Sequence, residues 1–186
     1  MLPDRLVMTL IARLFFKPSQ VEVPELERLW SPWRARYIAS GVDAQKEGCV
    51  FCAIANDKEH DEDNFVLHRA QHCFVVLNLY PYITGHLMVV PYLHTSEFHS
   101  TAKEITDEMM DQLKRAQSAL REVYGPAGFN MGMNLGSAAG AGIADHLHIH
   151  MLPRWGGDTN FMTTVGEARV LPEDLPTTYS KLKPRL

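Results

Sequence analysis

Three histidines alternate with apolar residues in the run from Asp145 to Arg154. On a β-strand this alternation places His146, His148 and His150 on one face and the apolar residues between them on the other. The apolar face suits packing on a core, whereas histidine is a poor core residue and is costly to bury without a partner. Three imidazoles on one strand face therefore indicate chemistry rather than packing.

Two kinds of chemistry fit this pattern. Alternating histidines on a strand can ligate a zinc ion, or one imidazole can act as a nucleophile while its neighbours fix its tautomer and charge. A glycine-rich stretch, residues 136–142, runs directly into the histidines. It is either a flexible connector or a loop whose backbone amides approach phosphate oxygens closely, and its position favours the second interpretation.

The cysteines suggest a second site. Cys49 and Cys52 have the Cys-x-x-Cys spacing, and Cys73 makes the total odd. This usage fits a thiol or metal site in a reducing compartment better than a disulfide framework. Cys73 begins an apolar run and is most simply a small core residue.

The elements that must position these residues follow from local patterns. Residues 73–79 and 86–91 are rich in β-branched residues and, with a turn at 81–85, predict an antiparallel hairpin. The stretch 129–135 alternates apolar and polar residues and predicts a half-buried strand. The histidine run, 146–153, predicts another strand.

One long helix is expected between these pairs of strands. Apolar residues at helical spacing predict it over 101–124, with a capping box from Thr101 to Glu104, or a start at Thr106, and an end at Gly125. Hairpin-linked strands with one long helix favour an α+β fold with an antiparallel sheet.

The two ends of the chain give weaker patterns. A strand is possible at 165–171, with a short helix after Pro172. Residues 1–28 read as an extension, and its apolar stretch 6–16 is too short to span a bilayer. We expect 6–16 to form an amphipathic helix packed on the body or a partner, with targeting or surface anchoring as the alternative. The resulting expectation is a cytoplasmic protein without membrane contact.

Length and charge limit the functions further. The chain has 186 residues, 46% of them hydrophobic and 22% charged, which suits one domain with appended ends. The net charge is −4 with neutral histidines, so no global basic field favours a nucleic-acid partner. An anionic substrate must therefore be held by local groups.

The histidine run resembles the signature of the histidine-triad family: three alternating histidines, then Pro-Arg at 153–154. Residues 48–54 resemble the family's zinc-binding segment. Asn78, the stretch 85–91 and His94 resemble its central hairpin. The resemblance covers residues 29–186 and leaves 1–28 outside, so we expect an N-terminal extension followed by one histidine-triad domain.

Within the family, three sequence segments favour one branch. Residues 29–34, 78–82 and 155–161 resemble the bacterial diadenosine tetraphosphate phosphorylases, which lie nearer the fragile-histidine-triad branch than the monophosphoramidase branch. Asn78 supports this, because the phosphoramidase branch tends to carry Asp where the ribose hydroxyls bind. The family fold implies about five antiparallel strands and a long helix, in a sheet that extends across a homodimer.

The resemblance also implies catalytic roles. His148 would attack the α-phosphorus and form a nucleotidyl–imidazole, with its other nitrogen donating to the backbone carbonyl of His146. His150 would hold non-bridging oxygens as charge develops, and His86 would support the triad from the neighbouring strand.

Further residues would bind the nucleotide. Asn78 would hydrogen-bond the ribose, and three apolar side chains would sandwich the base: Phe51, Ile54 and Leu77. Residues expected to reach the phosphates are Asn134 and the amides of Ala141 and Gly142. One departure matters: residues 140–144 lack the Gln or Ser that relatives commonly place before the triad. The general acid for the leaving group therefore has no candidate.

A structural zinc site is implied by Cys49, Cys52, His94 and His146, with no organic cofactor. Two thiols and an unrelated surface His94 are the alternative. The expected reaction is nucleotidyl transfer from a dinucleoside polyphosphate to phosphate or water. Three alternatives remain: a nucleoside phosphoramidase, a non-catalytic nucleotide sensor of the same fold, and a hydrolase with all three strand histidines on a catalytic zinc.

Overall fold

A computed structural model of the chain describes residues 48–160, 163 and 170–186. The expected extension, 1–28, the segment 29–34 and most of the possible strand 165–171 lie outside these residues. Among the described residues, no helix is long and apolar enough to cross a membrane.

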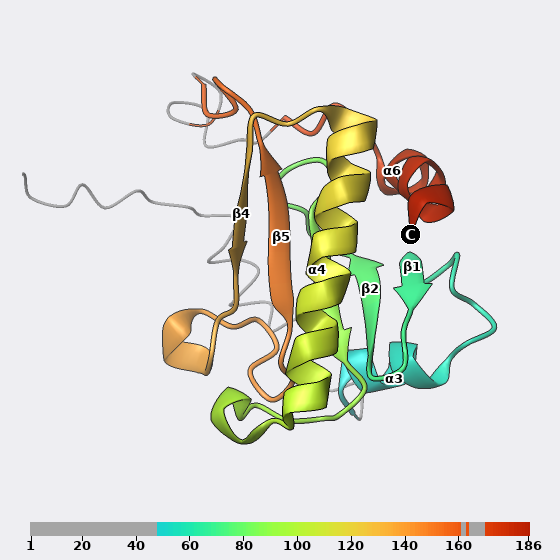
Figure 1. The fold of residues 1–186 in the computed structure, drawn as a ribbon. Helices are drawn as coiled ribbons and strands as arrows, with labels where there is room; N and C mark the ends of the chain where they lie inside the picture. Colours follow the sequence, from blue (N-terminus) through green and yellow to red (C-terminus); the bar gives the residue numbers. More distant parts are fainter. Residues whose placement is uncertain (1–47, 161–162, 164–169) are drawn as a thin grey trace, which may run out of the picture. The chain divides into compact units, whose positions relative to one another are not determined.

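Five antiparallel strands form one sheet in the order β1-β2-β3-β5-β4 (Figure 1). The α+β fold expected from the sequence is thus confirmed. The strands are β1 (Val66–Arg69), β2 (Cys73–Leu77), β3 (Leu87–Pro91), β4 (Gly128–Gly132) and β5 (Ile149–Arg154). The helices are α3 (Val50–Asn56), α4 (Lys103–Tyr124) and α6 (Leu175–Leu182), with short 3-10 turns η1 (Phe98–Ser100), η2 (Ser137–Ala139) and η3 (Lys183–Arg185).

The predicted hairpin is present as β2 and β3, and every residue of both strands is buried. Both faces of this central pair are covered, which explains why the strands read as continuous apolar runs rather than alternating ones. One set of side chains packs under α4 and the other packs with α3. The register pairs Val75 with Val89 and Val76 with Met88.

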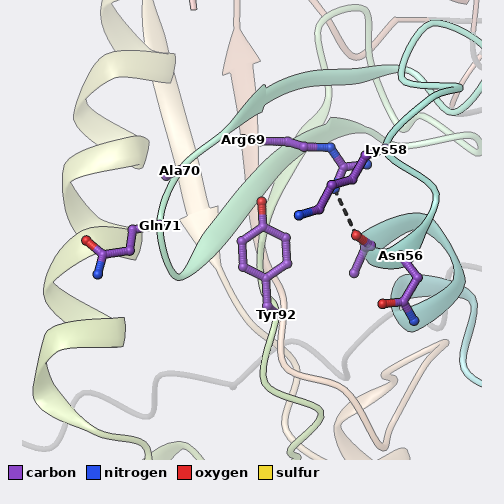
Figure 2. Close-up of a pocket in the computed structure, with 7 residues that line it drawn as sticks. Asn56, Lys58, Arg69, Ala70, Gln71 and Tyr92 are labelled. Atoms are coloured by element: carbon purple, nitrogen blue, oxygen red, sulfur yellow. Dashed lines mark hydrogen bonds between the residues drawn. The ribbon is translucent and has the colours of Figure 1, made fainter.

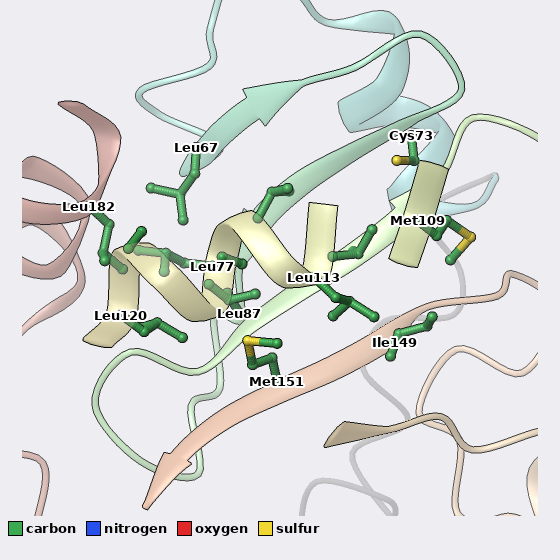
Figure 3. Packing of buried hydrophobic residues seen from close by; sticks show 14 residues of the cluster. Leu67, Cys73, Leu77, Leu87, Met109, Leu113, Leu120, Ile149, Met151 and Leu182 are labelled. Carbon is green, nitrogen blue, oxygen red and sulfur yellow. The ribbon is translucent and has the colours of Figure 1, made fainter. Parts of the chain in front are cut away.

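Helix α4 lies across one face of the sheet (Figure 1). Its buried residues, including Met109, Leu113 and Leu120, meet Ile149 and Met151 of β5 in the main core (Figure 3). This face follows from the apolar spacing that predicted the helix. Leu182 of α6 closes the same core beside α4.

The ends of α4 differ in how well the sequence anticipated them. Gly125 takes the left-handed conformation (φ 54°) and ends the helix, as predicted. The predicted capping box is wrong: the N-cap is Ala102, without a side-chain cap bond. The Thr101 hydroxyl instead donates to the carbonyl of Glu97, 2.8 Å away, because the preceding turn η1 brings that oxygen within reach.

Helix α3, which the sequence patterns did not predict, covers the opposite face of the sheet. Phe51 and Ile54 are buried there against strand residues such as Val76 and Met88. The guanidinium of Arg69 donates to the carbonyl oxygens at the end of this helix, those of Ile54, Ala55 and Asp57, and pairs with Asp61. These bonds satisfy orphan carbonyls and place a cation at the helix C-terminus.

A small cavity of about 390 Å³ lies beside Arg69 (Figure 2). Lys58, Gln71 and Tyr92 line it as well. The guanidinium in its wall is already committed to α3 and Asp61.

Strand β4 forms one edge of the sheet and pairs with β5. It is shorter than the predicted strand 129–135, and Met131 and Leu135 are 54% and 46% exposed. The half-buried pattern expected there is present in part: Phe129 and Met133 pack against the main core, whereas Met131 and Leu135 stay exposed.

A close approach at Gly85 fixes the loop between β2 and β3. Gly85 has a φ of +78°, and a Cβ there would lie 3.0 Å from Leu120 Cδ2 and 3.2 Å from Pro153 Cγ. Only a residue without a side chain fits this backbone conformation without strain. The loop is thereby held against α4 and the end of β5.

Candidate active site

The three histidines lie on the face of the sheet that α3 covers. Strand β5 begins at Ile149, three residues later than the predicted strand, so His146 and His148 lie in the segment that precedes it. The Leu147 amide still donates to the Thr95 carbonyl at 2.7 Å, which keeps this segment beside its neighbour. The predicted alternation is present, because Ile149 and Met151 pack in the core under α4 whereas the rings of His146 and His148 contact Phe51 of α3.

The His148 ring is held with one nitrogen committed. Its Nδ1 lies 2.9 Å from the backbone carbonyl of His146, and a carbonyl can only accept, so Nδ1 carries the proton. The ring is 5% exposed and packs on Phe51, with ring centroids 5.1 Å apart. Burial lowers the pKa of His148, against the opposing effect of the backbone bond. A neutral imidazole in this tautomer keeps a lone pair on Nε2.

A chain of hydrogen bonds places the proton of His150 on Nε2, whereas His148 carries its proton on Nδ1. The backbone N–H of Tyr82 donates to Nδ1 of His86 at 3.1 Å. Neutral His86 therefore carries its proton on Nε2, which lies 2.9 Å from Nδ1 of His150. His150 must then hold its own proton on Nε2.

Burial keeps both of these imidazoles neutral. It lowers the pKa of His86 to about 3, with the neighbouring His150 and His148 adding to the effect. It also lowers the pKa of His150 to about 4, with His148 adding. The rings of His148 and His150 lie 4.8 Å apart between centroids, so a bare nitrogen stands beside an N–H donor. That pair suits attack on an electrophile that carries negatively charged oxygens.

Four potential metal ligands converge near the start of the histidine run. The ligand atoms of Cys49, Cys52, His94 and His146 all lie within 4.8 Å of one another. Sγ of Cys49 and Nδ1 of His94 are 3.3 and 3.2 Å from Nδ1 of His146. His146 Nε2 donates to the Pro91 carbonyl at 2.8 Å, which leaves Nδ1 bare toward the thiols. Two thiolates and two imidazoles at these separations suit a four-coordinate zinc ion.

The hydrolase with three histidines on one zinc does not fit this geometry. Of the three, the described cluster includes His146 alone. Nδ1 of His148 is used by a carbonyl and Nδ1 of His150 by His86. The three rings therefore have different partners rather than one shared ion.

The predicted nucleotide-binding residues fall into separate places. The Asn78 amide lies 3.4 Å from the ring nitrogens of His86, beside the histidines, and its oxygen accepts from the Tyr80 amide. Phe51 and Ile54 share the α3 cluster. Leu77 does not join them, because it packs under α4 on the other face of the sheet. Its predicted place in the base sandwich is therefore wrong, and Val76, one residue earlier, occupies the expected face.

The glycine-rich loop leads into the site through turn η2 and a left-handed Gly140 (φ 84°). The Ala141 amide donates to the Gly136 carbonyl at 3.4 Å, a long bond that a ligand could replace. Gly142 is exposed and Asn134 is half-buried. Their contacts with phosphate stay a prediction.

Sequence reasoning missed Tyr82 as a functional residue. Its ring lies 4.6 Å from that of His86 and 6.1 Å from that of His150, and its amide sets the His86 tautomer. The amide contact depends on the path of the backbone, so residue type gives no signal for it. The carbonyl of Pro91, which orients His146, was missed for the same reason.

Comparison with known proteins identifies the family of the chain. Residues 59–157 match the family model described as the HIT domain. The chain is also 40% identical over 158 residues to a Mycobacterium tuberculosis protein named AP-4-A phosphorylase, covering 83% of this chain and 81% of that one. The chain therefore belongs to the histidine-triad (HIT) family.

Two other relatives extend the comparison. A zinc-bound histidine triad family protein from Mycobacterium smegmatis has a similar structure, with a TM-score of 0.61 and 26% identity, over 74% of this chain and 92% of that chain. Adenosine 5'-monophosphoramidase HNT1 from Saccharomyces cerevisiae is 26% identical over 107 residues, covering 57% of this chain and 62% of that protein.

Proposed function

We propose that this protein transfers a nucleotidyl group from a dinucleoside polyphosphate to phosphate or water, through a covalent intermediate on His148. The main support is that a carbonyl holds the Nδ1 proton of His148 and leaves Nε2 bare, next to the N–H of His150. The relative named AP-4-A phosphorylase supports this substrate class.

The reaction has two balanced displacements. First, the Nε2 lone pair of His148 attacks the α-phosphorus; a P–N bond forms, and the P–O bond to the leaving nucleotide breaks with its electron pair on oxygen. Second, an oxygen of phosphate or water attacks the same phosphorus, the P–N bond breaks, and the pair returns to Nε2. Solvent supplies the proton that the leaving group gains and accepts the one that the attacking oxygen loses.

Other residues would bind and orient the substrate. The Nε2–H of His150 would donate to a non-bridging oxygen as charge develops. Asn78 would bond the ribose, and Phe51 and Ile54 would contact the base from the α3 side. The phosphates would meet the loop that precedes the histidines, through Asn134 and the amides of Ala141 and Gly142.

The same proposal includes a zinc ion, a dimer and a domain boundary. Cys49, Cys52, His94 and His146 would hold the zinc, which would supply a structural cross-link between the α3 segment and the histidine run. Strand β4, which ends the sheet that the described residues form and carries the exposed Met131, would join a second copy in a continuous sheet. Residues 29–186 would form the histidine-triad domain. Its cytoplasmic location stays a prediction.

The test is incubation with diadenosine tetraphosphate, with and without inorganic phosphate, and separation of the products. ADP and ATP formed only with phosphate identify a phosphorylase, whereas AMP and ATP identify a hydrolase. Turnover of adenosine 5'-phosphoramidate without turnover of diadenosine tetraphosphate would favour the phosphoramidase, a choice that the HNT1 relative makes worth testing. Wild-type protein that turns over no nucleotide would favour the sensor.

A His148→Asn variant tests the covalent step. Asn keeps a donor for the His146 carbonyl but has no nucleophilic nitrogen, so we expect kcat to fall at least ~1,000-fold while nucleotide binding remains. His60→Asn is the matched control, because His60 is exposed and its ion pair is with Asp57 on the surface. Radiolabel from an α-phosphorus-labelled substrate should remain on wild type denatured in alkali, where the P–N bond is stable, and not on the variant; equal labelling of both would contradict the assignment.

A further inference from the structure

A second cavity, of about 690 Å³, lies beyond His150 along strand β5, on the side of the strand that carries the histidines. Leu152 and Arg154 follow His150 on the same side of β5 and line the cavity. Tyr82 lines it as well, and its ring centroid is 6.1 Å from that of His150. The volume falls within the range of about 300–1,000 Å³ that small-molecule sites occupy. The cavity therefore opens beside the reacting groups, at the end of the row away from the four metal-ligand candidates.

The cations of this cavity already have anionic partners. Asp158 pairs with the Arg154 guanidinium through Nε and Nη2, and the amide oxygen of Asn130 accepts from its Nη1. Glu173 pairs with Lys181. A lining with balanced charges is poorly suited to a polyphosphate and better suited to a neutral group.

The remaining lining is aromatic and apolar. The rings of Tyr124 and Trp155 meet edge to face, 6.5 Å apart, and Tyr82 contributes a third ring. Ile83 and Leu152 add aliphatic surface. Aromatic and apolar walls of this kind suit a planar heteroaromatic ring, because every nucleobase offers a face for stacking.

One buried hydroxyl in the cavity lining has no partner. Thr84 is 8% exposed, and its Oγ1 makes no hydrogen bond with any described residue. An unsatisfied buried polar atom costs free energy, and a ligand atom that reached the Thr84 hydroxyl would offset this cost. This observation is independent of the aromatic lining and indicates a ligand with hydrogen-bonding edges.

We propose that this cavity binds the second nucleoside of the substrate, the one that departs with the leaving polyphosphate. Its base would lie among the rings of Tyr82, Tyr124 and Trp155, with Thr84 bonding a base or ribose atom. The polyphosphate would run past His150 toward His148. This inference rests on the proposed function and makes this cavity the origin of a preference for dinucleoside substrates.

The test compares two substrates that differ only in the second nucleoside: diadenosine tetraphosphate and adenosine 5'-tetraphosphate. Leu152→Trp fills the cavity, and Thr84→Val removes the hydroxyl at nearly constant volume. We expect the ratio of kcat/KM for the dinucleoside to that for the mononucleoside to fall about tenfold in Leu152→Trp. Thr84→Val should lower the ratio about threefold, because one hydrogen bond is lost.

Matched variants separate binding from damage to the fold. Leu152→Met keeps the volume and Thr84→Ser keeps the hydroxyl, so both should retain the wild-type ratio. Thr84→Val removes an unpaired polar atom, so its melting temperature should not fall. An unchanged ratio in Leu152→Trp and Thr84→Val, or an equal loss for both substrates, would overturn the proposal.

A binding arm distinguishes this inference from the proposed reaction. Calorimetry with adenosine, on wild type already saturated with AMP, should detect a second site that Leu152→Trp removes. If wild type turns over no nucleotide but this second site is present, the proposed reaction fails and the cavity assignment stands. If adenosine finds no second site while turnover is normal, the cavity assignment fails alone.

Discussion

Each histidine of the site receives its protonation state from a backbone group. Carbonyls of Pro91 and His146 fix the rings of His146 and His148, and the amide of Tyr82 acts through His86 on His150. Three chemically identical side chains thus gain the different protonation states that the proposed metal ligand, nucleophile and donor require. Replacing any one of them is expected to change a role that its neighbours cannot take over.

Acid sensitivity is the residue-scale prediction. Unfolded histidines bind protons near their ordinary pKa of 6.5, whereas His86 and His150 in the fold do so only near about 3 and 4. Between these values the unfolded chain binds more protons, so the free energy of unfolding should fall as pH falls from about 6.5. Each such histidine contributes up to about 1.4 kcal/mol per pH unit.

Urea unfolding at pH 7, 6 and 5 measures this dependence. His86→Gln should flatten the slope by about 1 kcal/mol per pH unit. His99→Asn should leave it unchanged, because the His99 side chain is 81% exposed. Identical slopes for wild type and His86→Gln would show that His86 titrates normally in the fold.

For single residues, the sequence predicted the strand face of some side chains correctly and of others wrongly. The alternation of histidines with apolar residues predicted correctly that His146, His148 and His150 share one face, because the two kinds of residue are easily told apart in this segment. Leu77 was assigned to the wrong face because β2 is apolar throughout and buried on both sides. In such a strand, only the register with β3 decides which residue faces α3.

At the scale of elements, Arg69 ties strand β1 to helix α3. Its side chain is 15% exposed and bonds Asp61 and three carbonyls at the helix end. Arg69→Met should leave these groups unpaired and lower the free energy of unfolding by about 2–4 kcal/mol. Urea denaturation measures this change.

The control for that variant is Lys114→Met. Lys114 pairs with Asp111 on the surface, with side chains 73% and 66% exposed, and such a pair contributes at most about 1 kcal/mol. Comparable losses from Lys114→Met and Arg69→Met would mean that Arg69 does not anchor α3.

The metal cluster supports a second prediction at this scale. Purified protein should contain about one zinc per chain, and Cys52→Ser should lose it and melt about 5 °C lower or more. Cys73→Ser should keep the zinc, because Cys73 is buried in the α4 core, away from the cluster. Elemental analysis and thermal melts measure both effects; a full zinc content in Cys52→Ser would remove Cys52 from the site.

The helices and strands also differ in how well the sequence predicted them. The central hairpin and α4 were predicted because their patterns are long and regular. Strand β1 was missed because it has four residues, ends in His68 and Arg69, and carries an irregular register with β2. The start of α4 was misplaced because the hydroxyl of Thr101 found a closer acceptor outside the helix.

At the scale of the whole molecule, the position of β4 at the end of the sheet that residues 48–160 form predicts an assembly. An edge strand with Met131 exposed is a template for pairing with another chain. Wild type should sediment as a dimer, and Met131→Lys should shift it toward the monomer. Met110→Lys, on the exposed side of α4 at 48% exposure, is the matched control. A wild-type monomer in analytical ultracentrifugation would remove the shared sheet.

Gly85, which has no side chain, affects the protonation of the histidines indirectly. Because Gly85 lets its loop lie against Leu120 and Pro153, the Tyr82 amide stands where His86 needs a donor. The direction of the His150 proton is therefore set partly by steric clearance on the helix side of the sheet. Exchanging the imidazoles alone would not change the clearance at Gly85, which would still determine where the Tyr82 amide lies. A redesign of the proton donor must therefore include the loop and the helix as well.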